Sequence, residues 1–505
     1  MAPRTRGSFS TSFITSSQHH APCEAPWTKR NVVMSRSSMT RPILPSSSPI
    51  YNLPMPPFGS LLPNIVAPPP GPNSRRLARS LARRESPGVS TIHLGQTPIV
   101  YTRAKGANVQ DADGNIYIDM TGGFGVANLG HADRKVVAAV QRQSAKLLHA
   151  LGDVYPSDAR VQLVERLSKL VPIPNAKVML CTTGSEAVEL ALKTALLATK
   201  RTGILAFDGA FHGQSYGALA VTSRPYFRAP FQDQLFQGVV RAPFPDPYRS
   251  HLSLEGCLQH VGKLLASPPE HVGPIGAVIV EPIQGREGEI IPVPGFLPGL
   301  RALCDRHGAL LIADEMITGF GRTGAWFAVQ HAKVVPDLLC LGKAMAGGMP
   351  IAACVGKASV MDAWRYEGPE ALHASTFLGH PVAAAAALAS IAELQRRNAP
   401  RQAKATGDWL LSELRGLQAK HPLIGDVRGM GLMLGIELVK DRAAKEPAPE
   451  AAARVMQAML RKGVILLAGG AHGSVLSLTP PLTITKAQLA YAVKAMEEAM
   501  EEVMG

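Results

Sequence analysis

A lysine at the end of an apolar run is the first residue whose position suggests chemistry. In the segment DLLCLGKAMAGGMPI, residues 337–351, Lys343 follows the apolar run and precedes small, flexible residues. At the rim of a buried strand an ammonium group is poorly solvated, which lowers its pKa and makes the neutral amine available as a nucleophile. A surface lysine just past the end of a strand is the alternative explanation of this segment taken alone.

Two acidic residues end another apolar run. The segment ALLIADE, residues 309–315, finishes with Asp314 and Glu315. A carboxylate at this place could simply cap the following turn. Asp314 could instead hold a proton on a heteroaromatic nitrogen through a charge-assisted hydrogen bond.

Two further strand ends carry residues suited to a flat, anionic ligand. Between a strand-like run and a helical one stand Thr182, Thr183, Gly184 and Ser185. Free backbone amides and the positive end of a helix favour an anion there, although Thr183 or Ser185 could be an ordinary N-cap. In the segment AFHG, the ring of Phe211 could cover a planar ligand, although an aromatic residue at a strand end is more often part of the core.

Together, a lysine, an acid, an aromatic ring and an anion cradle suit pyridoxal 5′-phosphate. Lys343 would form the Schiff base, and Asp314 would keep the pyridine nitrogen protonated so that the ring can accept charge from a substrate carbanion. Phe211 would stack on the ring. Gly184 and Ser185 would hold the phosphate.

The elements that must position these residues follow an α/β pattern. From about residue 97, strand-like runs alternate with helical ones, and Asp113-Gly114 marks a hairpin. This alternation predicts a mostly parallel sheet covered by helices on both faces, with ligands beyond the carboxyl ends of the strands. After about Pro400 a long polar helix, a strand pair around GDVRGMGLMLGIEL and further helices predict a second, smaller domain.

Composition indicates a large globular protein and argues against several classes. The chain has 505 residues, of which 46% are hydrophobic and 18% charged, and no apolar run is long enough to span a bilayer. Its six cysteines show no CxxC spacing, which favours a reducing, cytoplasmic setting and gives little support to a zinc or other metal site.

The basic excess lies mainly in the first 90 residues, which carry +9 of the net charge of +14. Their Ser- and Pro-rich composition predicts a disordered extension over residues 1–90, with a possible short basic helix at SRRLARSLARRE. An Arg- and Ser-rich, acid-poor segment is also typical of a transit peptide, so a mitochondrial location is the alternative. Binding of nucleic acid through this arm is a rival function, although the rest of the chain gives no reason to expect nucleic-acid or membrane partners.

The order and spacing of seven segments resemble class III pyridoxal-phosphate aminotransferases of fold type I, from about residue 90 to the C-terminus. These segments are TTGSEAVELALK, AFHG, VEPIQG, DEMITGFGRTG, LGKAMAGGMP, HASTFLGHPVAAAAAL and GDVRGMGLMLGIEL. The resemblance implies a large domain with a seven-stranded type of sheet and a smaller α+β domain built from the N-terminal segment and the C-terminus. The expected division is 91–150 and 396–505 for the small domain, and 151–395 for the large, cofactor-binding domain.

The resemblance also implies roles for other residues. Thr376 is similar to the threonine that reaches the cofactor phosphate of the neighbouring subunit, which implies a homodimer with shared active sites. Glu281 would lie near the ring, and His212 is expected among the cofactor-binding residues beside Phe211. Gly123 and Phe124, together with Tyr155, resemble positions that line the substrate pocket.

Three positions depart from the family pattern. Ile317 stands where members usually carry a glutamine near the ring oxygen. Ser477 replaces an arginine that binds substrate carboxylates in many members, and Arg286 replaces a glutamate that can pair with it. We therefore hypothesise that Arg286 supplies the missing carboxylate-binding cation. In the alternative, Arg286 points to solvent and pairs with Glu287 or Glu289.

The expected activity is transfer of an amino group from an amino acid, an ω-amino acid or an amine, such as 4-aminobutyrate, to pyruvate or 2-oxoglutarate. Lys343 would move the proton from the substrate carbon to the cofactor. Family members that share every cofactor residue include racemases or epimerases and a dialkylglycine-type decarboxylase, and these activities remain alternatives.

Overall fold

The structure is a computed structural model that describes residues 57–89, 97–250 and 252–504. The expectations for residues 1–56 and 90–96, the transit peptide among them, lie outside this part. No helix within the described ranges combines the length and apolar character needed to cross a membrane.

A seven-stranded sheet forms the centre of the large domain. Its strand order is β4-β10-β9-β8-β7-β5-β6, in which β10 runs antiparallel to both neighbours and the other pairs are parallel. The predicted mostly parallel sheet is thus confirmed. The strands are β4 (Ala176–Cys181), β5 (Gly203–Phe207), β6 (Val239–Ala242), β7 (Ile275–Val280), β8 (Leu310–Asp314), β9 (Leu338–Leu341) and β10 (Ala352–Lys357).

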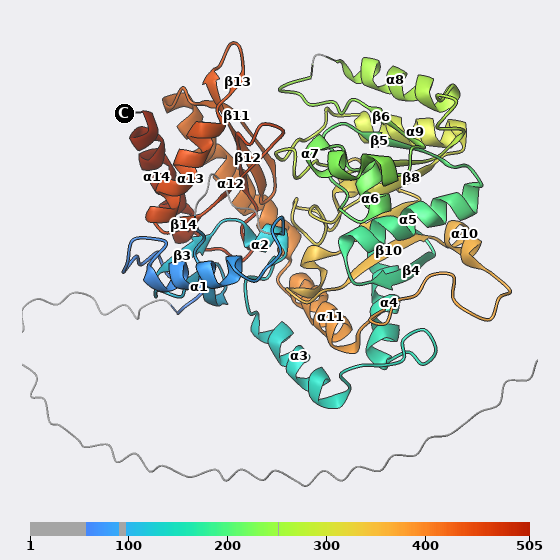
Figure 1. Cartoon of the computed structure of the whole chain (residues 1–505), viewed down its shortest axis with the longest axis horizontal. Coiled ribbons are helices and arrows are strands. Elements are labelled where there is room, and N and C mark those ends of the chain that lie inside the picture. Colours follow the sequence, from blue (N-terminus) through green and yellow to red (C-terminus); the bar gives the residue numbers. More distant parts are fainter. Residues whose placement is uncertain (1–56, 90–96, 251, 505) are drawn as a thin grey trace, which may run out of the picture. The chain divides into compact units, whose positions relative to one another are not determined.

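Helices cover both faces of this sheet because its strands are apolar on both sides. Along β7, Ala277 and Ile279 pack with α5 and α6, whereas Val278 and Val280 pack with α8 and α9. Figure 1 shows α8 and α9 lying side by side. The helices and turns of this region are α4 (Asp158–Leu170), α5 (Gly184–Thr199), α6 (Tyr216–Val221), α7 (Pro225–Arg228), η2 (Ala229–Gln234), α8 (Leu254–Ala266), α9 (Phe296–His307), η3 (Ala328–Gln330), η4 (Lys343–Ala346), α10 (Ala358–Met361), η5 (Asp362–Trp364) and α11 (Pro381–Arg396).

A four-stranded sheet joins the N-terminal and C-terminal parts of the chain. Strands β2 (Asn108–Asp111) and β3 (Ile116–Asp119) form the hairpin predicted at Asp113-Gly114, and β1 (Tyr101–Lys105) extends it. The short strand β14 (Val464–Ile465) pairs in parallel with β3. Residues more than 300 positions apart in the sequence therefore build one sheet.

The C-terminal segment forms the helices and the strand pair predicted after Pro400. Strands β11 and β12 lead into a second sheet, in the order β11-β12-β16-β15 with β13 paired to β12. Figure 1 shows α13 and α14 next to each other and to β14. The elements are α12 (Ala399–Lys420), β11 (Ile424–Met430), β12 (Met433–Asp441), β13 (Glu446–Pro447), α13 (Pro449–Arg461), β15 (Leu467–Gly469), β16 (Val475–Leu478) and α14 (Lys486–Met504).

The division into domains at residues 150 and 395 remains a proposal. Helix α3 (Arg134–Lys146) precedes the first boundary but packs against α11, which in turn packs against α4 beside the seven-stranded sheet. The short turn α2 (Gly122–Gly125) precedes it.

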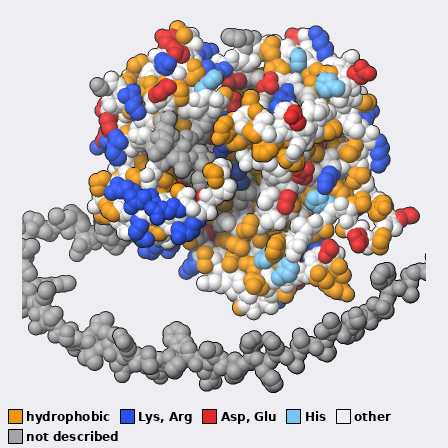
Figure 2. Space-filling model, viewed as in Figure 1, with side chains coloured by type: hydrophobic (Ala, Val, Ile, Leu, Met, Phe, Trp, Pro, Cys, Tyr) orange, Lys and Arg blue, Asp and Glu red, His pale blue; other side chains and the backbone are white. Residues whose placement is uncertain are grey.

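Residues 57–89, part of the extension that was expected to be disordered, are described by the structure, and the short basic helix expected at SRRLARSLARRE is present as α1 (Pro72–Ala82). The basic helix α1 forms because Asp113, from the β2–β3 turn, caps its start: the carboxylate accepts hydrogen bonds from the amides of Asn73 (2.7 Å) and Ser74 (2.9 Å). Figure 2 shows basic side chains gathered over this helix and the turn after it, where Arg75, Arg76, Arg79, Arg83 and Arg84 are exposed.

Candidate active site

Five strand ends of the seven-stranded sheet meet around one cavity of about 240 Å³. The strands β4, β5, β7, β8 and β9 each deliver residues to it just beyond their carboxyl ends, as expected for a parallel sheet. Its lining residues are Thr183, Gly184, Ser185, Phe211, His212, Gly213, Glu281, Ile283, Asp314, Met316, Ile317, Thr318 and Lys343.

Lys343 begins the short 3-10 turn η4, immediately after β9. Its φ of +39° is a conformation that a side chain with a Cβ rarely adopts, which indicates that the surrounding structure holds the lysine in place. Burial lowers its pKa, while the carboxylates of Asp314 and Glu281 oppose this effect and the guanidinium of Arg286 adds to it. Neither a hydrogen bond nor an ion pair joins Lys343 Nζ to another residue of the described part.

Asp314 ends β8 and is fixed by a buried histidine. His212 Nδ1 lies 2.8 Å from Asp314 Oδ2, and Asp314 Oδ1 accepts a hydrogen bond from the amide of Met316 at 3.1 Å. Because a carboxylate only accepts, Nδ1 carries the proton. The backbone amide of His212 is in turn held by Thr222 Oγ1 at 2.9 Å.

Glu281 follows β7 and ties two loops of the site together. Its Oε1 accepts a hydrogen bond from the amide of Phe211 at 2.9 Å, and its Oε2 accepts one from Gly285 at 3.0 Å. Burial raises the pKa of Glu281 to about 7, against a smaller opposite effect of His212 and with help from the nearby charge of Asp314.

At the start of α5, two backbone amides, those of Gly184 and Ser185, remain available to bind an anion. Thr183 is the N-cap and, with Glu186, forms a capping box: Thr183 Oγ1 accepts from the amide of Glu186, and the Glu186 carboxylate accepts from the amides of Thr182 and Thr183. The hydroxyl of Ser185 is not the cap but accepts from the amide of Gln214 at 3.2 Å. Both sequence alternatives, an N-cap and an anion cradle, are therefore compatible at this helix end.

These residues fit pyridoxal 5′-phosphate. A Cβ on Gly213, where φ is +130°, would overlap Ser185 Oγ and lie 3.0 Å from Ser185 Cβ, and a Cβ on Gly184 would lie 3.0 Å from Met316 Sδ. The glycines therefore let the backbone amides approach the space where the phosphate would lie. The amine of Lys343, the carboxylate of Asp314 and the ring of Phe211 line the rest of the cavity.

Arg286 lies over the aromatic side of the cavity. Its guanidinium carbon is 5.1 Å from the ring centroid of Phe211 and 6.0 Å from that of Phe227. The alternative ion pairs do not form: Glu287 pairs with Arg224 at 3.3 Å, and Glu289 binds Ser477. Within the described residues, the Arg286 guanidinium forms no ion pair, and burial together with Arg224 lowers its pKa against an opposing effect of Glu281.

Ser477 and Glu289, 188 positions apart in the sequence, form a hydrogen bond of 3.0 Å from Ser477 Oγ to Glu289 Oε2. Glu289 is buried, and burial raises its pKa to about 8, partly offset by Ser477 and Arg428. Ser477 therefore binds a carboxyl group of the protein.

Four residues that the resemblance predicted for the site differ from one another in how close they lie to the cavity. Ile317 lines it, and the space above Gly125 faces Ile317 Cγ2 at 3.7 Å, so the turn that carries Phe124 lies close to the site. Phe124 itself is 58% exposed, and Tyr155 is 72% exposed. Thr376 is also exposed and does not line the cavity of its own chain.

Sequence reasoning missed several residues of the site. Gly213, Ile283, Met316 and Thr318 line the cavity. They fall within the segments AFHG, VEPIQG and DEMITGFGRTG, but none of them was assigned a role. The glycine-rich loop GFGRTG was singled out, but its Arg322 is fully buried and donates to the carbonyl of Leu432 at 2.9 Å, to that of Pro480 and to Asn128 Oδ1. This arginine joins the GFGRTG loop to the N-terminal and C-terminal parts of the chain and does not line the cavity.

Other parts of the described chain offer less chemistry. A shallow hollow of about 530 Å³ includes Arg396 and Arg397, but both arginines pair with Glu393. No group of three or more His, Cys, Asp or Glu side chains in the described ranges is arranged to hold a metal ion.

Comparison with known proteins places this site in a family. The family model "Aminotransferase class-III" matches residues 91–500. The chain is 39% identical to the 5-aminovalerate aminotransferase DavT of Pseudomonas aeruginosa over 420 residues, covering 82% of this chain and 96% of that protein. It is 38% identical to the 4-aminobutyrate aminotransferase GabT of Escherichia coli, covering 82% and 95%, and 34% identical to an alanine/serine racemase of Pyrococcus horikoshii, covering 88% and 93%.

The fold agrees with solved transaminase structures. A PLP-bound amine transaminase from an uncultivated Pseudomonas species superposes with a TM-score of 0.77 at 31% identity, covering 83% of this chain and 98% of that one. The predicted fold class and cofactor are thereby confirmed. The chain belongs to the class-III aminotransferases, pyridoxal-phosphate enzymes that transfer an amino group from an amino donor to a 2-oxo acid.

Proposed function

We propose that the amino donor is an ω-amino acid of the 4-aminobutyrate or 5-aminovalerate type, and that Arg286 binds the carboxylates of donor and acceptor. The observation that carries this proposal is the guanidinium of Arg286, 5.1 Å from the Phe211 ring and without an ion pair among the described residues. The relatives named for these two donors support the substrate class.

Each residue of the site has a defined task in the proposed reaction. The bound pyridoxal ring supplies the electron sink that accepts charge from the substrate carbon. Lys343 Nζ would hold the cofactor through its aldehyde and would carry the proton of the substrate carbon. Asp314, oriented by His212, would keep the pyridine nitrogen protonated. Phe211 would cover the ring, and Gly184 and Ser185 would hold the phosphate.

The remaining ring contacts come from Glu281 and Ile317. Glu281 fixes the Phe211 and Gly285 amides, and so aligns the aromatic wall with the loop that follows β7. Ile317 contributes only apolar contact where relatives of the family pattern carry a glutamine. Phe124 and Tyr155 line the approach to the substrate pocket, and Ser477 restrains Glu289 instead of binding substrate.

Substitution of Arg286 tests the carboxylate site. We expect Arg286→Ala to raise KM for 4-aminobutyrate and for the oxo-acid acceptor by about 10- to 100-fold, the loss of one charge-assisted contact, while Arg286→Lys retains part of the affinity. Unchanged KM values in Arg286→Ala would exclude this role. A screen of 4-aminobutyrate, 5-aminovalerate and putrescine, each with pyruvate and with 2-oxoglutarate, identifies the preferred pair.

The racemase-named relative supports racemisation as a second candidate function. Incubation of the cofactor-loaded protein with one alanine enantiomer, in the absence of any oxo acid, separates the two. Loss of optical rotation without formation of a keto product indicates racemisation, whereas a stoichiometric keto product that stops after one turnover indicates transamination.

We further propose a homodimer in which Thr376 of one subunit reaches the phosphate of the other. The exposure of Thr376 and its absence from the lining of its own cavity support this arrangement. When Lys343→Ala and Thr376→Val subunits are mixed, a shared site gives heterodimers with one fully wild-type site and restored cofactor affinity. If Thr376 served its own subunit, no wild-type site would form and no recovery would be measured.

A cytoplasmic location is our proposal, because the five cysteines of the described residues are buried, free thiols. Mass spectrometry of the N-terminus of the protein isolated from its own cells tests it. An N-terminus shortened by removal of the basic extension would favour the mitochondrial alternative.

A further inference from the structure

Arg428, in β11, connects the loop of Arg286 to the C-terminal sheet. Arg428 Nε donates a hydrogen bond of 2.7 Å to the carbonyl of Gly288, and its Nη1 lies 2.7 Å from Glu437 Oε2 and 2.8 Å from Asp426 Oδ2. The arginine side chain is only 10% exposed. Three acceptors on two segments therefore fix one planar guanidinium.

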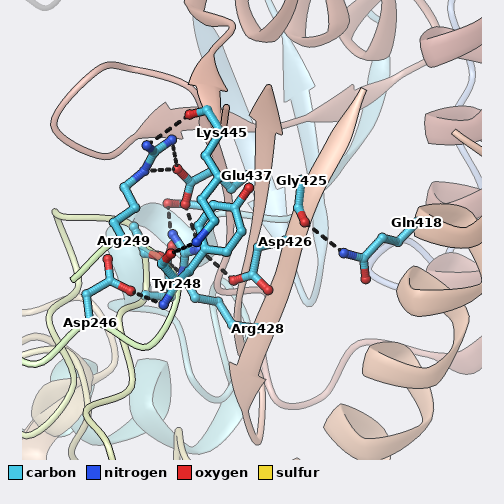
Figure 3. A network of polar contacts seen from close by, with 12 residues as sticks. Asp246, Tyr248, Arg249, Gln418, Gly425, Asp426, Arg428, Glu437 and Lys445 are labelled. Atoms are coloured by element: carbon cyan, nitrogen blue, oxygen red, sulfur yellow. Dashed lines mark hydrogen bonds and ion pairs between the residues drawn. The ribbon is translucent and has the colours of Figure 1, made fainter. Parts of the chain in front are cut away.

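Glu437 is held in turn from the large domain (Figure 3). Arg249, in the segment between β6 and α8, forms an ion pair with Glu437 and donates from Nη1 to the carbonyl of Lys445 at 3.0 Å. Lys445 Nζ donates to the carbonyl of Tyr248 at 2.6 Å and lies 4.7 Å above its ring. A continuous polar chain thus runs from the large domain, through β12, to Arg428.

The loop at the end of this chain is tightly restrained and carries the site. Gly288 has a φ of +108° and Glu289 a φ of +54°, and a Cβ on Gly288 would lie 2.8 Å from Val475 Cγ2. A non-glycine residue in the left-handed region persists where its surroundings determine it. Between Gly285, bound to Glu281, and Gly288, bound to Arg428, stands Arg286.

We propose that Arg428 is a positioning residue for the reaction, which holds the 285–289 loop so that Arg286 meets the substrate carboxylate. The inference rests on the proposed role of Arg286. Arg249 and Glu437 extend the support, because Glu437 accepts from both arginines and is 2% exposed. In this proposal Arg428, Glu437 and Arg249 contact neither substrate nor cofactor. They act through the Gly288 carbonyl.

A double-mutant cycle tests the inference. We expect Arg428→Lys, which keeps the charge but replaces the planar, forked donor by a single ammonium group, to raise KM for 4-aminobutyrate or pyruvate about tenfold, with kcat changed less than about threefold. In the Arg286→Ala background the same substitution should raise KM by less than about twofold. Equal effects in both backgrounds, or a fall in kcat alone, would overturn the proposal, because a general structural defect does not depend on Arg286.

Controls separate this inference from the proposed function. Arg249→Lys weakens the same series of contacts at its other end, the ion pair with Glu437, and should raise KM about threefold. This variant replaces Arg428→Lys if Arg428→Lys fails to fold. Lys440→Met removes the exposed ion pair between Lys440 of β12 and Glu446 of β13 and should leave KM unchanged. Absence of wild-type turnover with any ω-amino acid, or an unchanged KM in Arg286→Ala, would instead contradict the proposed function.

Discussion

The imidazole of His212 lies 2.8 Å from the carboxylate of Asp314, and both side chains are buried. The contact joins a residue of the loop after β5 to the last residue of β8, and it fixes the rotation of the carboxylate. An oriented, charged Asp314 is what a protonated pyridine nitrogen requires.

Replacement of Asp314 by asparagine should lower kcat by at least about 100-fold, because a preorganised charge is lost where the ring accepts electrons. His212→Gln, which leaves the carboxylate but frees its rotation, should lower kcat by about tenfold. Steady-state kinetics on variants with the wild-type melting temperature check both values. Asp314→Asn with kcat within tenfold of wild type would contradict the assignment.

Replacement of Lys343 by alanine should abolish turnover and covalent attachment of the cofactor. After borohydride reduction of the cofactor-loaded protein, peptide mass spectrometry should find the pyridoxyl group on Lys343 in the wild type and on no peptide of the variant. A modified peptide elsewhere would overturn the assignment of the lysine. Lys357→Ala serves as a lysine control, although it also removes the ion pair with Asp337.

Gly213→Ala should weaken cofactor binding by about tenfold or more, because the new Cβ would overlap Ser185 Oγ and lie 3.1 Å from Ala218 Cβ at a φ of +130°. Titration with pyridoxal 5′-phosphate measures the effect. Gly416→Ala is the matched control: this exposed glycine of α12 has nothing within 4 Å of an added Cβ, so the substitution should stabilise the helix by about 1 kcal/mol and leave cofactor affinity unchanged.

Glu289→Gln should change the pH dependence of stability. The folded-state pKa of about 8 exceeds the ordinary value of 4.5, so the folded state binds a proton that the unfolded state has lost between these two values. The contribution of Glu289 is therefore fully present below about pH 4.5 and is lost as the pH rises to about 8, on the order of 5 kcal/mol in total.

Denaturant unfolding at several pH values tests this difference. The free energy of unfolding of Glu289→Gln should exceed that of the wild type increasingly as the pH rises from 5 to 8, with the ionisation of the buried carboxylate removed. Parallel pH profiles of the two proteins would show that Glu289 does not titrate in this range.

Site residues that lie at or just after the end of one strand could be predicted from the sequence alone. Lys343, Asp314, Gly184 and Ser185 each follow an apolar run, and burial of such runs as parallel strands brings their carboxyl ends to one edge of the sheet. Asp113-Gly114 predicted its hairpin for a similar local reason, since the two residues suit a tight turn between alternating strands.

The tertiary structure decided what depends on distant partners. No local sequence pattern predicts that Ser477 binds Glu289 or that Asp113 caps α1. Nor does one predict that Arg286 lies over Phe211 rather than pairing with a neighbouring acid. Residues 57–89 have the composition of a disordered segment, yet distant side chains bind their backbone: Asn108 and Asn115 accept hydrogen bonds from amides within residues 59–67, and Asp113 caps the start of α1. Local sequence sets which backbone conformations are favourable, whereas long-range contacts depend on which surfaces the folded sheets bring together.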